Sequence, residues 1–357
     1  MGRRLVLMIS PIEGPTVWKG GDFAGKESVS LDLRDGHLAA LGEAVESTAH
    51  LPVESLERAH FDDGQLQALM AEVRRELCEG RGLVVLRGFP ADDPERLARM
   101  FWGLSRHLGN PVSQSVMGER IGHVVDRSQN DPTARGYRQR YELTPHTDFQ
   151  EIVTFLCAQQ GCKGGVSWFV SGHTLHNEVM STRPDLLDAL YDGYHTHRFG
   201  EQESSETAIT PHRVPVFSNA GGFVSCRLLR RYIEAAANEA TPLSTREREA
   251  LEYVDSLSMD KRFGLLFTLE AGDAVFMNNY VVFHGRTAFE DGGESNQQRH
   301  LVRIWLTSKT PRPLDPRIFV YASEANGQGI APQPGKLPSY DDRETVDQVY
   351  GDRMPST

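Results

Sequence analysis

The residues best suited to metal chemistry in this chain are His146 and Asp148, within the stretch YELTPHTDFQ (141–150). Side chains two positions apart on extended backbone point to the same side, because their direction alternates along a strand. An imidazole and a carboxylate arranged in this way can take adjacent positions on one metal ion. A second imidazole would complete a set of two histidines and one carboxylate, which leaves one face of the ion open.

The His-x-Asp/Glu spacing alone is a weak signal. With 13 His and 49 Asp and Glu in 357 residues, chance gives about two such triplets, and the chain holds three. The triplet that begins at His60 opens a helical pattern, in which Asp62 or Asp63 is better interpreted as an N-cap. The triplet that begins at His176 lies inside a helical pattern, where residues two apart point in different directions. The alternative for His146 and Asp148 is a surface loop with a capping aspartate.

A second group of candidate residues stands near the C-terminus. His284 follows an apolar run, 274–283, that predicts a strand ending at the histidine. Arg299 and Arg303 share one face of a later predicted strand. A buried arginine needs an anionic partner, and its planar fork suits a carboxylate. The alternatives are a structural histidine at a strand end and surface ion pairs of the arginines with Glu290, Asp291 or Glu294.

Composition argues against several kinds of partner. The formal net charge of -11 argues against nucleic acid, because phosphate neutralisation requires a basic face. No apolar run has the length of a membrane span, and Leu5–Ile9 is too short for a secretory signal. The four cysteines form no CxxC or zinc-like pairs, so free thiols in a reducing cytoplasm are expected. None of these features names a function, and a homo-oligomer is compatible with the sequence.

Many short strands interleaved with a few helices predict a mainly β fold with helical decorations, built on a double-stranded β-helix (jelly-roll) core. Period-two or continuous apolar runs predict strands, and capping signals and 3.6-residue periodicity predict helices. The predicted strands are 82–89, 121–126, 149–158, 166–170, 265–269, 274–283 and 300–307, with hairpins within 194–224. The predicted helices are 39–47, 65–78, 94–108, one from Thr174, one from Pro184, and one from the capping box Ser244-x-x-Glu247 to Leu257.

The whole chain, 1–357, is expected to form a single domain. Its jelly-roll core would cover about 82–307, with a helical insertion at about 174–258 and an irregular tail at about 311–357. The polar loop 128–140 directly precedes the His146 motif and is a candidate lid. The alternative is an ordinary surface connection.

The order of these motifs resembles a known family. It is similar to that of the taurine dioxygenase-like (TauD/TfdA) and clavaminate synthase-like Fe(II)/2-oxoglutarate oxygenases. The matching motifs are HTD at 146–148, Gly-Gly-x-Ser at 164–167, His-Gly-Arg-Thr at 284–287 and Arg-x-x-x-Arg at 299–303. The likeness covers residues 82–306 and is strongest at 143–181 and 272–306.

The resemblance implies roles for the candidate residues. His146, Asp148 and His284 would hold the iron, and Arg299 would pair with the distal carboxylate of 2-oxoglutarate. Ser167 would bind the same carboxylate, because the family's hydroxyl partner sits two residues after a Gly-Gly pair. Thr174 competes for this role, but its place at a predicted helix start makes N-capping the better interpretation.

Substrate-binding residues are implied less directly. The family often uses its later arginine for an acidic substrate, which would be Arg303, and Asn279 stands where members carry an asparagine in the strand. Tyr141, Phe149 and Trp168 are candidates for the substrate wall, with core packing as the alternative. The loop between HTD and Gly-Gly is shorter than in taurine dioxygenase, which argues against taurine as the substrate.

The activity implied by the resemblance is a dioxygenase that uses Fe(II), 2-oxoglutarate and O2. Oxidative decarboxylation to succinate and CO2 would accompany oxidation of an unactivated C–H bond in a small, carboxylate-bearing substrate, by hydroxylation, desaturation or cyclisation. Asp148 favours hydroxylation over halogenation, because related halogenases lack the carboxylate. One alternative is a non-catalytic jelly-roll protein that binds a metal or small molecule. Another is a zinc or manganese hydrolase, which would leave Arg299 and Ser167 without a role.

Overall fold

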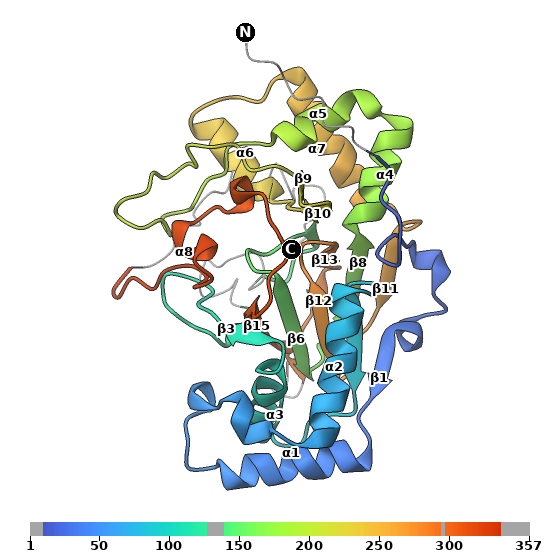
Figure 1. The fold of residues 1–357 in the computed structure, drawn as a ribbon, viewed down its shortest axis with the longest axis vertical. Helices are drawn as coiled ribbons and strands as arrows, with labels where there is room; N and C mark the ends of the chain where they lie inside the picture. Colours follow the sequence, from blue (N-terminus) through green and yellow to red (C-terminus); the bar gives the residue numbers. More distant parts are fainter. Residues whose placement is uncertain (1–9, 127–138, 294–296, 337–357) are drawn as a thin grey trace.

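The computed structural model describes residues 10–126, 139–293 and 297–336. These residues form two facing β-sheets with helices on their outer sides (Figure 1). The predicted fold class, mainly β with helical decorations and a jelly-roll core, is confirmed. Over the described residues the two sheets do not close into a barrel.

The larger sheet has seven strands. Its strands in spatial order are β1 (Ser30–Asp32), β2 (Leu83–Arg87), β12 (Ala274–Asn278), β6 (Ile152–Gln159), β15 (His300–Ser308) and β3 (Gly109–Pro111), with β4 (Gly122–Val124) also paired to β15. The β1–β2 pair is parallel and the other pairs are antiparallel. The continuous apolar run in β2 fits this position, since its side chains are covered on both faces of the sheet.

The smaller sheet has four antiparallel strands, which carry most of the candidate metal ligands. Their spatial order is β11 (Gly264–Phe267), β8 (Ser167–Ser171), β13 (Val282–Arg286) and β5 (Leu143–His146). Two short ribbons complete the described strands: β9 (Phe217–Ala220) with β10 (Phe223–Cys226), and β7 (Lys163–Gly164) with β14 (Phe289–Glu290).

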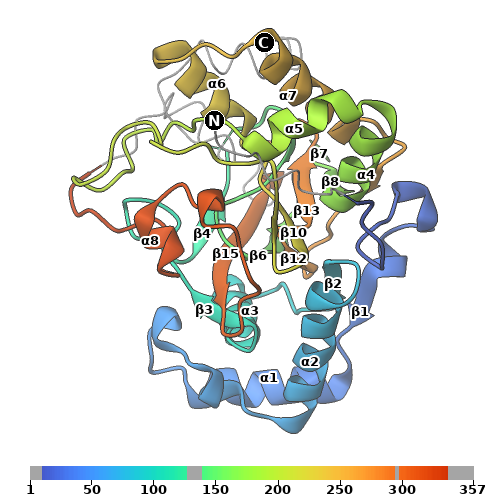
Figure 2. The same cartoon turned by 45° about the horizontal axis from the view of Figure 1, so that its top comes forward.

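Helices cover the outer face of each sheet, so the core has three apolar layers. The helices α1 (Asp35–Ser47), α2 (Gly64–Cys78) and α3 (Pro94–Ser105) pack on the larger sheet. The helices α4 (Gly172–Thr182), α5 (Pro184–Asp192), α6 (Arg230–Glu239) and α7 (Thr245–Ser258) pack with the smaller sheet and the β9–β10 ribbon. Figure 2 shows α4, α5 and α7 together beside β8. The middle layer, between the sheets, includes Val153 and Val275 of one sheet and Phe169 and Val282 of the other.

Local capping signals set several helix starts as predicted. Asp63 accepts the backbone N–H groups of Gln65 and Leu66 at the start of α2, and Ser244 with Glu247 forms the capping box of α7. The N-cap prediction for Thr174 is wrong. Helix α4 begins two residues earlier, Ser171 caps it, and the Thr174 hydroxyl donates to the carbonyl of Trp18.

Two other predictions need correction. The apolar run 274–283 is not one strand but two, because the chain turns between β12 and β13 at Asn279. His284 therefore lies within β13 rather than at the end of a strand. Helix α6 was not predicted, and its N-cap residue, Leu229, makes no side-chain capping bond.

The tail and the candidate lid are only partly described. Residues 128–138 of the lid candidate and 337–357 of the tail lie outside the described residues. The described part of the tail contains a 3-10 turn at Pro316–Ile318 and the short helix α8 (Ala322–Ala325). Among the described helices, none has the length and apolar character required to cross a membrane. The division into core, insertion and tail stays a prediction.

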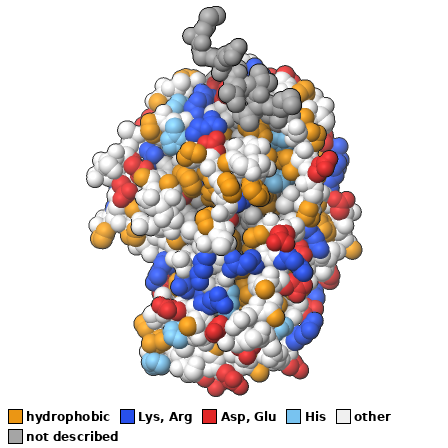
Figure 3. All heavy atoms as spheres, in the orientation of Figure 1, with side chains coloured by type: hydrophobic (Ala, Val, Ile, Leu, Met, Phe, Trp, Pro, Cys, Tyr) orange, Lys and Arg blue, Asp and Glu red, His pale blue; other side chains and the backbone are white. Residues whose placement is uncertain are grey.

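The face seen in Figure 1 carries a band of Lys and Arg side chains at the level of α2 and α3 (Figure 3). Cations of this protein also affect one another: burial, together with Arg106, Arg58 and Arg74, lowers the pKa of Lys309. The net charge of -11 therefore does not describe this face, since local fields follow the distribution of charge.

Candidate metal centre

Two neighbouring strands bring the two candidate histidines together. Strand β5 ends at His146, and the register of the β5–β13 pair sets His284 directly opposite it. Their ring centroids lie 4.5 Å apart. The two imidazoles, 138 positions apart in the sequence, therefore meet at one edge of the smaller sheet.

Asp148 completes the cluster from the turn between β5 and β6. Its Oδ2 atom lies 3.7 Å from Nε2 of His284, and one ligand atom from each of the three residues lies within 4.8 Å of the others. An ion with ligand bonds of about 2.1 Å would draw these atoms together by small side-chain rotations. The three predicted ligands thus form one cluster that fits a metal ion.

Hydrogen bonding prepares His146 to be a ligand. Its Nδ1 lies 2.8 Å from the carbonyl oxygen of Thr144, so Nδ1 carries the proton and donates it. Removal of water from the ring lowers the pKa of His146 to about 4, and the neighbouring His284 adds to the effect. The imidazole is therefore neutral at pH 7, with the lone pair of Nε2 available to a metal.

The backbone of Asp148 is held by Asn279, which stands in the turn between β12 and β13. The side-chain oxygen of Asn279 accepts the N–H of Asp148 at 2.9 Å, and its nitrogen donates to the carbonyl of Asp148 at 2.7 Å. The same nitrogen donates to the carbonyl of Gln150 at 2.8 Å. This asparagine is predicted to bind substrate, but its described side-chain contacts are with the backbone of the turn that carries Asp148.

Two side chains of β15 hold the carboxylate of Asp148. The indole N–H of Trp305 donates to Oδ2 at 2.9 Å, and Nη1 of Arg303 lies 3.1 Å from the same oxygen. Burial alone would raise the pKa of Asp148, but Arg303, His284 and His146 outweigh it and hold the pKa well below its ordinary value. The carboxylate is therefore ionised, and groups of the protein itself orient it.

A cavity between the two sheets has both histidines in its wall. Apolar side chains form much of its wall, and three arginines and a serine supply polar groups. Its lining residues are Val124, Leu143, His146, Phe155, Ser167, Phe169, Leu269, His284, Gly285, Arg286, Arg299, Leu301 and Arg303. Both predicted partners of 2-oxoglutarate, Arg299 and Ser167, are among them.

Arg299 is a buried cation whose guanidinium forms no ion pair with a described residue, although the carboxylate of Asp291 is near enough to attract it. The residue is 3% exposed, and its Nε and Nη1 atoms make no hydrogen bond to any described group. Burial lowers its pKa to about 10, so the guanidinium remains charged at neutral pH. A buried charge of this kind requires a partner, and a carboxylate matches the fork of an arginine. The arrangement fits the distal carboxylate of 2-oxoglutarate.

The surface ion pairs offered as alternatives for Arg299 are absent among the described residues. Glu290 pairs with Lys163 at 3.2 Å, and Asp291 accepts the backbone N–H of Arg299 at 2.7 Å rather than its guanidinium. Glu294 lies outside the described residues.

The Gly-Gly motif before Ser167 gives Arg299 its space. Gly165 has a φ of +66°, and a Cβ there would stand 2.9 Å from Nε of Arg299. A side chain at this position would strain the backbone and displace the guanidinium. The motif therefore contributes to the cavity through the absence of a side chain.

Three other substrate candidates do not line this cavity. Trp168 alternates with Ser167 and Phe169 along β8, so it faces the helices behind the sheet. Phe149 packs against Trp305 and Tyr321, and the carbonyl of Tyr141 accepts a hydrogen bond from Arg286. Their substrate roles stay predictions.

Sequence reasoning did not identify Trp305, Gln114 or Arg227 as parts of the site. Trp305 could have been found, because it lies two residues beyond Arg303 and shares its strand face. Gln114 accepts from Nε of Arg303 at 2.7 Å, and Arg227 donates to the carbonyl of Asp148 at 2.6 Å. Neither has a local sequence signal, because both contacts join distant segments.

A family model described as "Taurine catabolism dioxygenase TauD, TfdA family" matches residues 47–305, which is well over half of the chain. FR-33289 synthase from Streptomyces rubellomurinus is 27% identical over 319 residues, covering 86% of this chain and 93% of that protein.

Solved structures share the fold. Asparagine oxygenase in complex with Fe(II), 2S,3S-3-hydroxyasparagine and succinate has a TM-score of 0.63 and 19% identity, covering 78% of this chain and 93% of its own. The non-heme iron oxygenase OrfP with Fe, succinate and (3S)-hydroxy-L-Arg has a TM-score of 0.59 and 16% identity, covering 78% of this chain and 94% of its own. Another OrfP structure contains Fe and alpha-ketoglutaric acid.

Proposed function

Because the chain belongs to the taurine catabolism dioxygenase TauD, TfdA family of Fe(II)/2-oxoglutarate-dependent oxygenases, we propose that His146, Asp148 and His284 are its iron ligands. Fe(II), 2-oxoglutarate and O2 are its cofactor and co-substrates. When bound, they supply the oxidation of a C–H bond together with decarboxylation of 2-oxoglutarate to succinate and CO2.

Arg299 and Ser167 bind the distal carboxylate of 2-oxoglutarate in this proposal. The observation that carries it is the buried guanidinium of Arg299, whose Nε and Nη1 have no partner among the described groups, in the same cavity as two imidazoles. Leu143, Phe155 and other apolar lining residues reduce the contact of the site with water, which strengthens the electrostatic interactions inside it.

The substrate is proposed to be a small, carboxylate-bearing molecule that is hydroxylated. The structural relatives named above contain hydroxylated amino acids, hydroxyasparagine and hydroxyarginine. Arg303 lines the cavity close to Asp148 and offers a positive charge near the reacting centre. A substrate carboxylate could share this guanidinium with Asp148. A cytoplasmic location is also proposed, because all four cysteines are free thiols.

The test is turnover with Fe(II), 2-oxoglutarate and O2 across a panel of amino acids and other small carboxylates. We expect succinate to form with the parent protein and with Glu252→Gln, which changes an exposed residue of α7. His146→Ala and Asp148→Ala should lose both succinate formation and Fe(II) binding. Consumption of 2-oxoglutarate by either variant at the parent rate would overturn the ligand assignment.

A further inference from the structure

An arginine from outside the two main sheets reaches the backbone of the metal-ligand turn. Arg227 follows β10, and its Nη1 donates to the carbonyl of Asp148 at 2.6 Å, while Nη2 lies 3.3 Å from the carbonyl of Phe149. Its guanidinium lies over the rings of Phe149 and Tyr280, at 5.7 and 5.6 Å from their centroids. The cation is thus fixed against the residue that carries the candidate carboxylate ligand.

The counter-charge of Arg227 comes from Glu324 in the C-terminal helix α8. Nη2 of Arg227 lies 2.5 Å from Oε1 of Glu324, and the two side chains are 0% and 1% exposed. The other oxygen, Oε2, accepts the backbone N–H of Val320 at 2.9 Å. A buried ion pair is stable only when such additional hydrogen bonds complete it. Glu324 lies beyond residue 305, where the family match ends.

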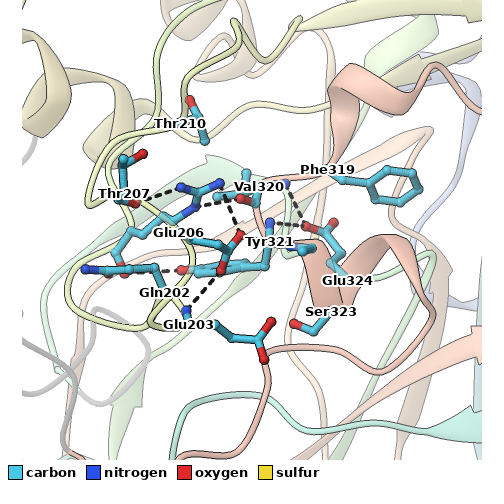
Figure 4. A network of polar contacts seen from close by, with 12 residues as sticks. Gln202, Glu203, Glu206, Thr207, Thr210, Phe319, Val320, Tyr321, Ser323 and Glu324 are labelled. Carbon is cyan, nitrogen blue, oxygen red and sulfur yellow. Dashed lines mark hydrogen bonds and ion pairs between the residues drawn. The ribbon is translucent and has the colours of Figure 1, made fainter.

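Glu324 is itself held in place by a polar network between α8 and the loop 198–210 (Figure 4). Nε of Arg198 donates to the carbonyl of Val320 at 2.7 Å, and the carboxylate of Glu206 accepts the N–H of Ala322 at 3.0 Å. The hydroxyl of Tyr321 donates to the carbonyl of Arg198 at 3.3 Å. A continuous set of contacts therefore runs from this loop through α8 and Arg227 to Asp148.

We propose that Arg227 and Glu324 are positioning residues, which set where the carboxylate of Asp148 stands relative to His146 and His284. The inference rests on the proposed iron site. The turn that carries Asp148 follows the last residue of β5, so contacts outside the strand ladder fix it. Asn279 holds its N–H and carbonyl from one element, and Arg227 holds the same carbonyl from another. Helix α8 thereby influences the geometry of the metal centre through Arg227.

The experiment compares metal binding by the parent, Glu324→Gln and Arg227→Lys, with Co(II) as the probe in the absence of 2-oxoglutarate. Titration calorimetry gives the affinity, and the visible Co(II) absorption reports the coordination geometry. Both variants should bind Co(II) roughly 10- to 100-fold more weakly, as is typical when a group that orients a metal ligand is lost. Their Co(II) spectra should differ from that of the parent.

Asp273→Asn is the matched control, because it disrupts another buried ion pair. Lys26 Nζ lies 2.6 Å from Oδ2 of Asp273, and the two side chains are 9% and 5% exposed. Asp273 directly precedes β12, whereas Asn279 directly follows it. This variant should lose thermal stability and bind Co(II) like the parent. The inference is overturned if Glu324→Gln and Arg227→Lys keep the parent's Co(II) affinity and spectrum and lose only stability. The ion pair of Arg227 and Glu324 would then have a purely structural role.

His146→Ala separates failure of the inference from failure of the proposed function. If His146→Ala binds Co(II) as tightly as the parent, the metal-site assignment is wrong. If His146→Ala loses binding while Glu324→Gln and Arg227→Lys bind like the parent, only the positioning inference is wrong. Near-UV circular dichroism verifies the fold of every variant. Should Glu324→Gln fail to fold, Glu324→Asp retains the charge while withdrawing the carboxylate from Arg227, and it is measured against the same two outcomes.

Discussion

A Cβ atom on Gly285 would stand 2.5 Å from the carbonyl oxygen of Leu143 on the neighbouring strand. Strand β13 can therefore approach β5 closely only because position 285 lacks a side chain. This approach sets His284 opposite His146. Gly285→Ala should push the strands apart and weaken Co(II) binding by roughly tenfold or more, the scale of lost ligand orientation.

Calorimetric titration measures the effect of Gly285→Ala. Gly64→Ala is the control, because nothing lies within 4 Å of a Cβ built on Gly64. Equal metal affinity in the two variants would show that the close approach of β5 and β13 is not required at the site.

Arg299→Gln should mainly weaken binding of 2-oxoglutarate. The guanidinium is buried and free to receive a carboxylate at Nε and Nη1, and loss of one partner from a buried charge pair typically costs about 2 kcal/mol or more. The expected rise in KM for 2-oxoglutarate is therefore roughly 30-fold or more. Initial rates across a 2-oxoglutarate series measure it, with Arg87→Gln on the surface as control. An unchanged KM would contradict the assigned role.

Trp305→Phe should disturb the metal site while retaining an aromatic ring. The substitution removes the indole N–H that donates to Oδ2 of Asp148 at 2.9 Å but preserves ring packing against Phe149. We expect metal affinity or kcat to fall by roughly 10- to 100-fold, with only a small change in the thermal midpoint. Co(II) titration and a melting curve measure the two effects separately. A large loss of stability with unchanged Co(II) affinity would contradict this expectation.

Metal should stabilise the fold without being needed for it. The backbone ladder of β5 and β13 holds the two histidines in register, so EDTA should abolish turnover and leave a folded protein. At a free Co(II) concentration of about 100 times Kd, binding adds about 2.7 kcal/mol, which raises the thermal midpoint by a few degrees. His146→Ala should show no such rise, and an unfolded EDTA-treated protein would refute the prediction.

The α7 capping box should make stability depend on pH. Burial opposes ionisation of Glu247, but its bonds to Ser244 and Arg213 prevail and hold its pKa below the ordinary value. A carboxyl whose pKa is lower in the folded state than in the unfolded state stabilises the fold at pH values above its ordinary pKa. This stabilisation is lost as the pH falls through the folded-state pKa. Glu247→Gln should lower unfolding free energy by about 1 kcal/mol at pH 7, and by less at pH 3.

Urea unfolding of the parent and Glu247→Gln at both pH values measures this difference. Glu252→Gln, on an exposed position of the same helix, should change stability little at either pH. A destabilisation by Glu247→Gln that is the same at both pH values would rule out the charge as its source.

The features that could be predicted from the sequence are those with local signals. Period-two alternation placed Arg299 and Arg303 on one strand face, and both line the cavity. Capping residues marked α2 and α7. The family resemblance, rather than a local signal, implied that His146, Asp148 and His284 form a single cluster, and their ligand atoms do lie together.

The features that were missed depend on contacts between distant segments. The apolar run 274–283 divides at Asn279, where that residue bonds the backbone of Asp148 across 131 positions. Arg227 reaches the same turn across 79 positions. Helix α6 lacks a side-chain cap at Leu229, so no local signal marked its start. Tertiary contacts, rather than local propensity, decided the first two.

The two candidate imidazole ligands and the guanidinium proposed to anchor 2-oxoglutarate lie at different sheets. His146 and His284 belong to the four-stranded sheet, whereas Arg299 directly precedes β15 of the seven-stranded sheet. The thickness of the apolar filling between them, including Phe169 and Val275, therefore determines how far the anchor lies from the ligands. Substitutions that change the size of these core side chains, far from any reactive group, therefore offer a way to change which hydrogen of a substrate is attacked.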